Sequence, residues 1–219
     1  MLLLGLTGGS GAGKTTVLQT WAGLGAFTVD ADETYHRLLR EDVKLLEAIR
    51  TYFPEAFVSG SLDRKTLGRV VFASPERRRE LESLTHGAVI TAVELALDNA
   101  RRQGYKTAAV EALYLLETIP RQSFTVIIGI LAPLAERIER VSARDGVSCE
   151  YAAARIAAQP DDAYYREHCD IILENIAGKE ELVKRAEETH RLIIRNSEFG
   201  IRNSELLYIK CAQMNRIPN

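Results

Sequence analysis

Four residues near the start of the chain have types and spacing suited to phosphate chemistry. Gly8, Gly13, Lys14 and Thr15 fit the pattern G-x-x-x-x-G-K-[S/T]. The backbone N–H groups of such a loop can converge on phosphate oxygens, the lysine can reach the β- and γ-phosphates, and the threonine hydroxyl can ligate Mg²⁺. The pattern predicts a nucleotide-binding loop. The alternative is an ordinary glycine-rich turn between a strand and a helix.

Acidic residues at the ends of two predicted strands suggest what is done with the nucleotide. Asp30 and Asp32 follow the apolar run 26–29, and Glu111 ends the run 106–110. A carboxylate beside an acceptor hydroxyl can orient it and accept its proton, which favours phosphoryl transfer to a bound small alcohol. Helix N-capping is the alternative role for both aspartates, and it weighs more heavily for Asp30.

Two absences narrow the class of nucleotide-binding protein. The sequence has no N-K-x-D motif, which disfavours a guanine-specific switch protein. The apolar run 124–131 leads into Ala132 where motor-type ATPases place a metal-holding aspartate. A small-molecule kinase therefore fits the pattern better than a switch or a motor.

Three arginines lie three and four residues apart on the helix predicted to start after Pro133. Arg137, Arg140 and Arg144 share one face of that helix, and such a face can clamp triphosphate oxygens. The alternative is a solvated face paired with neighbouring glutamates. We expect Arg140 to take part in catalysis and Arg137 to belong to the solvated face.

The elements that must position these residues alternate along the chain. Five short apolar runs read as buried strands, at 1–6, 26–29, 106–110, 124–131 and 170–173, with helical segments between them. This alternation predicts an α/β fold with a five-stranded parallel sheet flanked by helices. In such a sheet, ligands bind at the carboxyl ends of the strands, so the loop and the two aspartates should face one crevice.

The stretch from residue 33 to 103 differs from the rest. It is helical in character with no convincing strand, and it is interrupted at Pro54 and at the turn-like segment 58–61. A block of this length is too long for a simple crossover. We expect it to be a helical substrate-binding domain.

Composition excludes several partners. The 219 residues carry a formal net charge of −2, which gives no bulk attraction to nucleic acid or to a membrane surface. Three scattered cysteines form no metal-ligand or disulfide pattern. No stretch approaches 18 consecutive apolar residues. We expect a soluble cytoplasmic protein.

Seven segments together closely resemble dephospho-coenzyme A kinases, over residues 1 to about 192. They are LTGGSGAGKTT at 6–16, VDAD at 29–32, LDRKTLGRVVFASPERRRELESLTH at 62–86, VEALYLLET at 110–118, RVSARD at 140–145, AAQ at 157–159 and Asn175. The resemblance implies a P-loop NTPase fold and ATP-dependent phosphorylation of the ribose 3′-hydroxyl of dephospho-CoA, the last step of coenzyme A synthesis. It implies ATP as phosphate donor, Mg²⁺, and a monomer that binds ATP and dephospho-CoA.

The resemblance also implies site residues by position. Catalysis would rest on Asp32 as base, Lys14 and Arg140. ATP would be bound by residues from the loop, the lid and the end of the last strand, namely Gly9, Gly11, Ala12, Gly13, Lys14, Thr15, Thr16, Arg144 and Asn175, with Thr15 on Mg²⁺. The acceptor would contact Asp32, Arg64, His86 and Leu113.

Two positions depart from the family pattern. Gly87 follows His86 where proline is usual, and Ala112 stands where many members carry proline before Leu113. We expect these departures to affect local backbone geometry more than chemistry. His86 without its proline is as readily a structural hydrogen-bonder as a substrate contact.

The expected division of the chain has four parts. The nucleotide-binding core covers 1–32, 104–139 and 168–195, the acceptor domain 33–103, the lid 140–167, and a tail of uncertain structure 196–219. The tail region contains IRNSEFG at 194–200, nearly repeated as IRNSELL at 201–207. Two other functions stay open: a P-loop kinase of another nucleoside or small alcohol, and a non-catalytic ATP-binding sensor.

Overall fold

The computed structural model describes residues 1–198, so residues 199–219 of the tail predicted at 196–219 lie outside the described residues. Its chain divides into two compact units. Among the described residues, the sheet unit comprises 1–28 and 100–198, and the helical unit comprises 29–99. No helix of the described part has both the length and the apolar character needed to cross a membrane.

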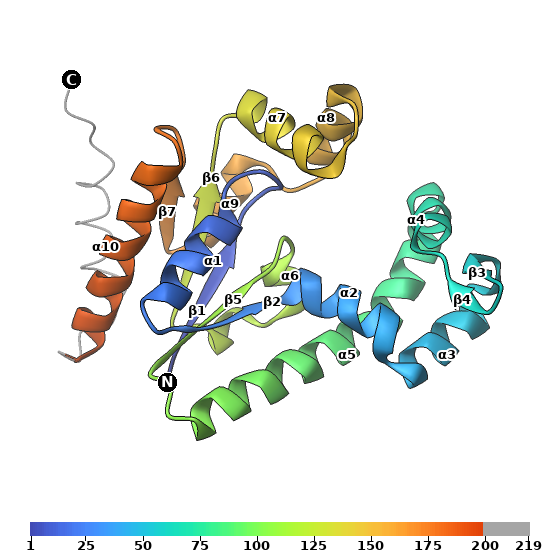
Figure 1. Cartoon of the computed structure of the whole chain (residues 1–219), viewed down its shortest axis with the longest axis horizontal. Coiled ribbons are helices and arrows are strands. Elements are labelled where there is room, and N and C mark those ends of the chain that lie inside the picture. The colour runs from blue at the N-terminus through green and yellow to red at the C-terminus, as the bar shows by residue number, and fades with distance from the viewer. Residues whose placement is uncertain (199–219) are drawn as a thin grey trace. The chain divides into compact units, whose positions relative to one another are not determined.

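A five-stranded sheet forms the centre of the fold, in the order β2-β5-β1-β6-β7 (Figure 1). Strand β1 pairs in parallel with β5 and β6, and β6 pairs in parallel with β7. All five predicted strands are confirmed, as β1 (Leu2–Thr7), β2 (Phe27–Asp30), β5 (Thr107–Glu111), β6 (Val126–Leu131) and β7 (Ile171–Glu174).

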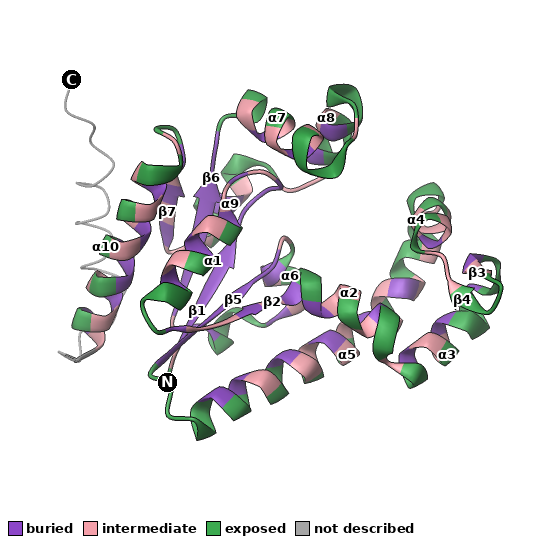
Figure 2. Ribbon diagram, viewed as in Figure 1, coloured by how far each residue is buried: buried purple, intermediate pink, exposed green. Residues whose placement is uncertain are grey.

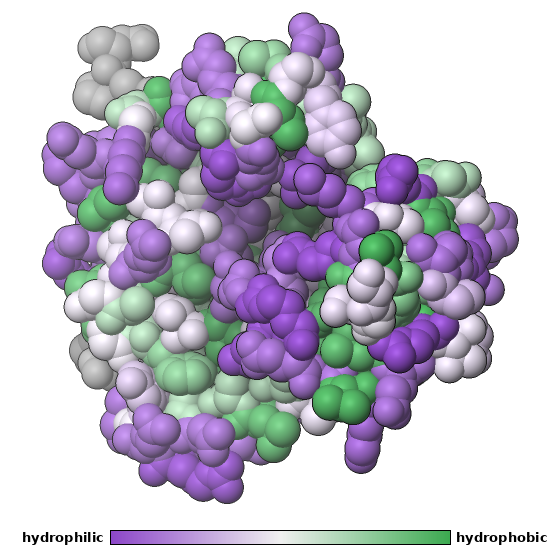
Figure 3. All heavy atoms as spheres, turned by 45° about the vertical axis from the view of Figure 1, so that its right-hand side comes forward, coloured by the Kyte–Doolittle hydropathy of each residue, from purple (hydrophilic) through white to green (hydrophobic). Residues whose placement is uncertain are grey.

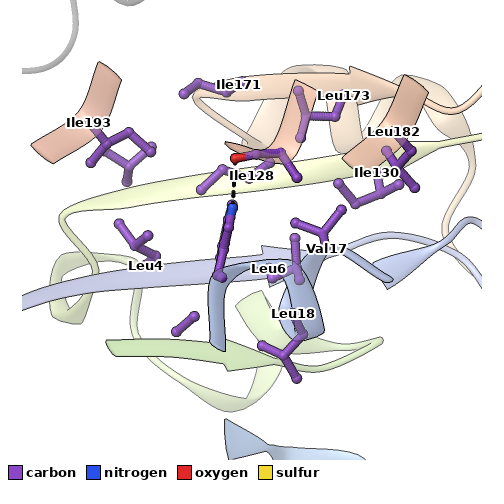
Figure 4. Close-up of a cluster of buried hydrophobic side chains, with 14 of the residues drawn as sticks. Leu4, Leu6, Val17, Leu18, Ile128, Ile130, Ile171, Leu173, Leu182 and Ile193 are labelled. Carbon is purple, nitrogen blue, oxygen red and sulfur yellow. Dashed lines mark hydrogen bonds between the residues drawn. The ribbon is translucent and has the colours of Figure 1, made fainter. Parts of the chain in front are cut away.

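Strand register shows which side chains form the apolar core on one face of the sheet. Leu4 pairs with Val126, and Ile128 pairs with Ile171, so alternate residues of β1, β6 and β7 point to the same side. There they pack against helices α1 (Lys14–Gly23) and α10 (Lys179–Glu198), which supply residues such as Val17 and Leu182 (Figure 4). The single tryptophan, Trp21, is buried here and its Nε1 donates to the carbonyl of Ala186 at 2.9 Å.

The other face of the sheet is covered by short helices. They are α6 (Leu115–Thr118), which lies against β1, and α9 (Asp162–His168), which lies against β6 and β7. The 3-10 helix η2 (Arg121–Ser123) lies between α6 and β6 in the chain. Gly5 and Gly129 belong to this face, and a methyl group on either would come within 2.8 Å of Leu115 or Ile172 respectively. β1, β5 and β6 are consequently buried along nearly their whole length (Figure 2).

Two further helices of the sheet unit pack on each other. They are α7 (Leu134–Asp145) and α8 (Cys149–Ala157), and Val141, Ala152 and Ile156 form a small buried cluster between them. Ser148 caps α8 by accepting a hydrogen bond from the backbone N–H of Tyr151. We call this pair, together with Ala158 and Gln159 that follow it, the α7–α8 hairpin.

The helical unit is mostly helix, as predicted. Its elements are α2 (Ala31–Glu41), α3 (Val43–Tyr52), the 3-10 helix η1 (Pro54–Ala56), α4 (Arg64–Ala73) and most of α5 (Pro75–Arg102). Aspartates cap three of these helices: Asp30 caps α2, Asp42 caps α3 and Asp63 caps α4. Its core is a separate apolar cluster that includes Phe53, Ile49 and Leu67.

One expectation for this unit is wrong. A short antiparallel pair, β3 (Phe57–Val58) with β4 (Ser61–Leu62), lies where no strand was expected. Ser59 and Gly60 connect the two strands with φ angles of 50° and 84°. Two consecutive residues of positive φ match the twist of a tight hairpin. Each strand has only two residues, which is too short for an alternating apolar pattern to reveal it in the sequence.

The face in Figure 3 shows hydrophilic and hydrophobic side chains interspersed. Exposed large apolar residues such as Phe72 and Val43 are scattered through the chain. Scattered exposure of this kind is ordinary for a folded protein.

Candidate nucleotide-binding site

Three glycines give the loop between β1 and α1 its shape. Gly8, Gly11 and Gly13 have φ angles of 140°, 77° and 113°, a region that residues with a side chain rarely adopt. A methyl group on Gly8 would lie 2.3 Å from the carbonyl oxygen of Ile130. The loop therefore passes too close to β6 for any residue but glycine.

Three consecutive carbonyls of the loop accept hydrogen bonds from side chains distant in sequence. Arg137 Nε donates to the oxygen of Ser10 at 3.1 Å, Arg140 Nη1 to that of Gly11 at 3.1 Å, and Asn175 Nδ2 to that of Ala12 at 2.9 Å. The N–H of a trans peptide points away from its C=O. The amides of Gly11 and Gly13 consequently face away from these side chains, as a backbone anion cradle requires.

Helix α1 begins directly after the cradle. Gly13 is its N-cap, and Lys14, Thr15 and Thr16 form its first turn. Lys14 is buried, and its Nζ lies 3.8 Å from Oε1 of the buried Glu111 at the end of β5. Thr15 is exposed and Thr16 is half-buried. The positive end of the helix dipole and a lysine thus lie together at the loop, which suits a phosphate group.

The expectation for Arg137 is wrong. Its side chain is buried rather than solvated, at 6% exposure, and its guanidinium lies against the loop backbone. A methyl group on Gly9 would overlap Arg137 Nη2 at 1.9 Å. Its acidic neighbour is Asp162, 3.8 Å from Nη1, rather than a glutamate of its own helix. Spacing on α7 could not show that this arginine points toward the loop after β1, because helical periodicity does not give the direction of the core.

The other two arginines of α7 have different surroundings. Besides its bond to the loop, Arg140 pairs with Glu136 one turn earlier. Arg144 is exposed and bonds Asp145, with Nε 2.7 Å from Oδ1. These hydrogen bonds, together with Arg155 nearby, hold the pKa of Asp145 below its usual value. The three arginines therefore share a helix face, but only Arg137 and Arg140 reach the loop.

The acids after β2 have separate surroundings within the helical unit. Asp30 accepts a hydrogen bond from the backbone N–H of Glu33 at 2.9 Å, so the capping interpretation of Asp30 is confirmed. Asp32 lies in the first turn of α2 and is exposed. Helix α2 also carries His36, whose Nδ1 lies 2.8 Å from Nη2 of Arg64. Burial, followed by the charge of Arg64, lowers the pKa of His36.

The remaining predicted residues lie in both units. His86 is half-buried in the middle of α5 in the helical unit. Leu113 follows β5 in the sheet unit, half-buried, and its carbonyl accepts a hydrogen bond from Thr7 Oγ1 at 3.1 Å. The described residues contain no group of three or more histidine, cysteine, aspartate or glutamate side chains arranged to hold a metal ion.

One residue at the loop was not anticipated. Gln159, just after α8, forms two hydrogen bonds to Ser10. The motif AAQ at 157–159 marks the position, but nothing in the sequence indicates that a residue 149 positions away touches the loop.

Comparison with known proteins agrees with this site. The family model for dephospho-CoA kinase matches residues 2–181. A dephospho-CoA kinase of Dehalococcoides mccartyi is 35% identical over 188 residues, which cover 83% of this chain and 92% of that protein. A solved structure from Thermus thermophilus is 34% identical with a TM-score of 0.76, covering 87% of this chain and 96% of its own.

A more distant structure shares the fold alone. The shikimate kinase of Acinetobacter baumannii, 17% identical, covers 90% of this chain and 94% of its own with a TM-score of 0.52. The predicted P-loop fold is thereby confirmed. Given the glycine loop, its anchoring side chains and the match over most of its length, the chain belongs to the dephospho-CoA kinase family, which uses ATP for the last step of coenzyme A synthesis.

Proposed function

We propose that this chain transfers the γ-phosphate of ATP to the ribose 3′-hydroxyl of dephospho-CoA, giving coenzyme A and ADP. The observation that carries the proposal is the dephospho-CoA kinase family match over residues 2–181. The loop supports ATP as the donor, because side chains hold three of its successive carbonyls and Lys14 lies beside Glu111. Because side chains already hold the loop, its N–H groups need not reorganise when a triphosphate binds. Such preorganised donors are usually the largest source of electrostatic stabilisation in an active site.

ATP is bound through its phosphates. The proposed contacts are the backbone of the loop and the side chains at its end, namely Gly9, Gly11, Ala12, Gly13, Lys14, Thr15 and Thr16. Asn175 acts through its bond to Ala12, and Arg144 contacts the nucleotide from the end of α7.

Mg²⁺ fits the residues present. This ion typically keeps several waters and takes only one or two protein ligands besides the substrate phosphates. An exposed threonine hydroxyl in the first turn of α1 satisfies that need, so Thr15 would hold the ion. When bound, Mg²⁺ supplies positive charge to the β- and γ-phosphate oxygens.

Asp32 acts as the general base. The 3′-oxygen forms a bond to the γ-phosphorus, the bond from that phosphorus to the β-phosphate oxygen breaks, and Asp32 takes the hydroxyl proton. Support comes from its position just after β2, because ligands of parallel sheets gather at the carboxyl ends of strands. Arg140, already bonded to the loop, supplies a positive charge for the transferring group.

The acceptor is held by the helical block 33–103, with Arg64 and His86, and by Leu113 from the core. Residues 140–167 serve as a lid that excludes water during transfer. We further propose that the protein acts as a monomer in the cytoplasm and binds neither nucleic acid nor membrane. The net charge of −2 supports the last point.

An acceptor panel tests the proposed function. ADP release is measured with Mg-ATP and dephospho-CoA, adenosine or shikimate, and phosphorus NMR identifies the position of the new phosphate. We expect turnover with dephospho-CoA alone and a 3′-monoester as product.

Two deoxy analogues provide the matched control. 2′-Deoxy-dephospho-CoA should remain a substrate, whereas the 3′-deoxy analogue should bind without releasing ADP above background. Turnover with another alcohol and none with dephospho-CoA would instead show a different kinase, and ATP binding with no acceptor at all would show a sensor.

A further inference from the structure

Gln159 and Ser10 form a two-point contact between the end of α8 and the phosphate loop. The backbone N–H of Ser10 donates to Gln159 Oε1 at 2.8 Å, and Gln159 Nε2 donates to Ser10 Oγ at 2.8 Å. The backbone N–H of Gln159 donates to the carbonyl of Ile156 at 3.1 Å, which fixes it at the end of the helix. One amide side chain thus satisfies both a backbone and a side-chain group of a single loop residue.

The carbonyl of Ser10 is held from the same hairpin. It accepts the hydrogen bond from Nε of Arg137 on α7. All three polar groups of Ser10 are therefore engaged by side chains of the α7–α8 hairpin, and Ser10 is 8% exposed. The hairpin is held together by its own buried cluster, so both contacts come from one packed body.

These hydrogen bonds determine which backbone N–H groups of the loop can face an anion. The Ser10 amide bonds to Gln159, so it is not among the N–H groups directed at phosphate. Both peptide bonds of Ser10 have a hydrogen bond to the hairpin, which fixes their orientation. Without these bonds the chain between Gly9 and Gly11 would be free to rotate, because glycine is conformationally permissive.

We propose that Gln159 is a positioning residue that keeps the phosphate loop in its nucleotide-competent conformation and couples the loop to the α7–α8 hairpin. A loop that is competent only part of the time binds with an affinity reduced by that fraction. Coupling is reciprocal, so a bound nucleotide also stabilises α8 against local opening. The inference rests on the proposed function only in taking ATP as the nucleotide.

Kinetics of Gln159→Ala test the inference. We expect the KM for ATP to rise about tenfold, the scale of losing two hydrogen bonds, with the KM for dephospho-CoA and kcat changed less than about twofold. Gln122→Ala, an exposed glutamine in η2, is the matched control and should leave both KM values unchanged. If Gln159 only stabilised the fold, Gln159→Ala would lower the melting temperature and leave the KM for ATP unchanged.

A double-mutant cycle sharpens the result. In a Ser10→Ala background, where one of the two bonds is already absent, Gln159→Ala should raise the KM for ATP by less than in the wild type. Equal effects in the two backgrounds would show that Gln159 does not act through the Ser10 hydroxyl and would overturn the two-point contact.

Equilibrium binding separates this inference from the proposed function. A non-hydrolysable ATP analogue needs no acceptor, so its dissociation constant reports the loop even if dephospho-CoA is the wrong substrate. We expect it to rise about tenfold in Gln159→Ala, and the analogue should protect the amides of α8 from hydrogen exchange in the wild type but not in the variant. An unchanged dissociation constant in a variant of normal melting temperature would overturn the inference.

Discussion

The phosphate loop at residues 8–15 and the helical unit at residues 29–99 are stabilised in different ways. The loop depends on positive φ angles and on side chains that reach its carbonyls from α7 and from the end of β7. The helical unit depends on local caps and on an apolar cluster of its own. Gly8, Gly11 and Gly13 therefore tolerate few other residues, whereas the helical unit distributes its stability over many small contacts.

Arginines show the same difference. In the loop region, Arg137 is buried and bonds to backbone. In the helical unit, Arg77 is partly exposed, bonds Glu55 and Glu80, and lies 4.1 Å from the ring centroid of Phe53. Exposed ion pairs of this kind contribute little individually and are replaceable. Arg137 is thus fixed by backbone contacts, whereas Arg77 belongs to a partly exposed group of ion pairs.

Lys14→Met should have the largest effect on activity. It removes the buried ammonium next to Glu111, and kcat/KM should fall by about 10²–10³-fold, as for loss of a group that stabilises transition-state charge. Lys184→Met, at an exposed position of α10, is the control in the same ADP-release assay. Equal activity of the two variants would mean that the loop lysine has no special role.

Gly8→Ala should have the largest effect on stability. Positive φ and the close approach to Ile130 act together, so the free energy of unfolding should drop by about 3 kcal/mol. Urea titration followed by Trp21 fluorescence measures this. Gly104→Ala is the control, because Gly104 has a φ of 84° but no atom near its would-be methyl group, and should cost about 1 kcal/mol.

Asp42→Ala should have an intermediate effect in the helical unit. Asp42 accepts the hydrogen bond of the Leu45 N–H at the start of α3, at 3.0 Å, and its loss should cost about 1 kcal/mol. Asparagine is an equally good cap, so Asp42→Asn should be close to neutral. Circular dichroism during thermal unfolding distinguishes the two, and equal losses would point to charge rather than capping.

Gly68→Ala should have the smallest effect, with the opposite sign. Gly68 lies inside α4 with no positive φ and nothing within 4 Å of an added methyl group. Alanine there should stabilise the protein by about 0.5–1 kcal/mol, because it favours helix more than glycine does. Destabilisation by this substitution would show that glycines of the helical unit are as constrained as those of the loop.

The two regions also differed in how well sequence predicted them. The loop and the strands were predicted closely, because apolar runs and the spacing of Gly8 to Thr15 are local signals. The burial of Arg137 and the bond from Gln159 to Ser10 were not predicted, because both depend on packing between elements far apart in sequence. The sequence alone allows Asp30 to be either a helix cap or a functional acid. The hydrogen bond that it accepts from the Glu33 N–H identifies it as the cap of α2.

The same pair of aspartates offers the most direct test of the proposed mechanism. Asp30 and Asp32 lie two residues apart, one capping α2 and the other proposed as the base. In Asp32→Asn, binding of a non-hydrolysable ATP analogue should be unchanged while kcat with dephospho-CoA falls by about 10²-fold or more, the usual scale for loss of a general base. Asp30→Asn keeps the cap and should keep kcat. Near-normal turnover in Asp32→Asn would contradict the account.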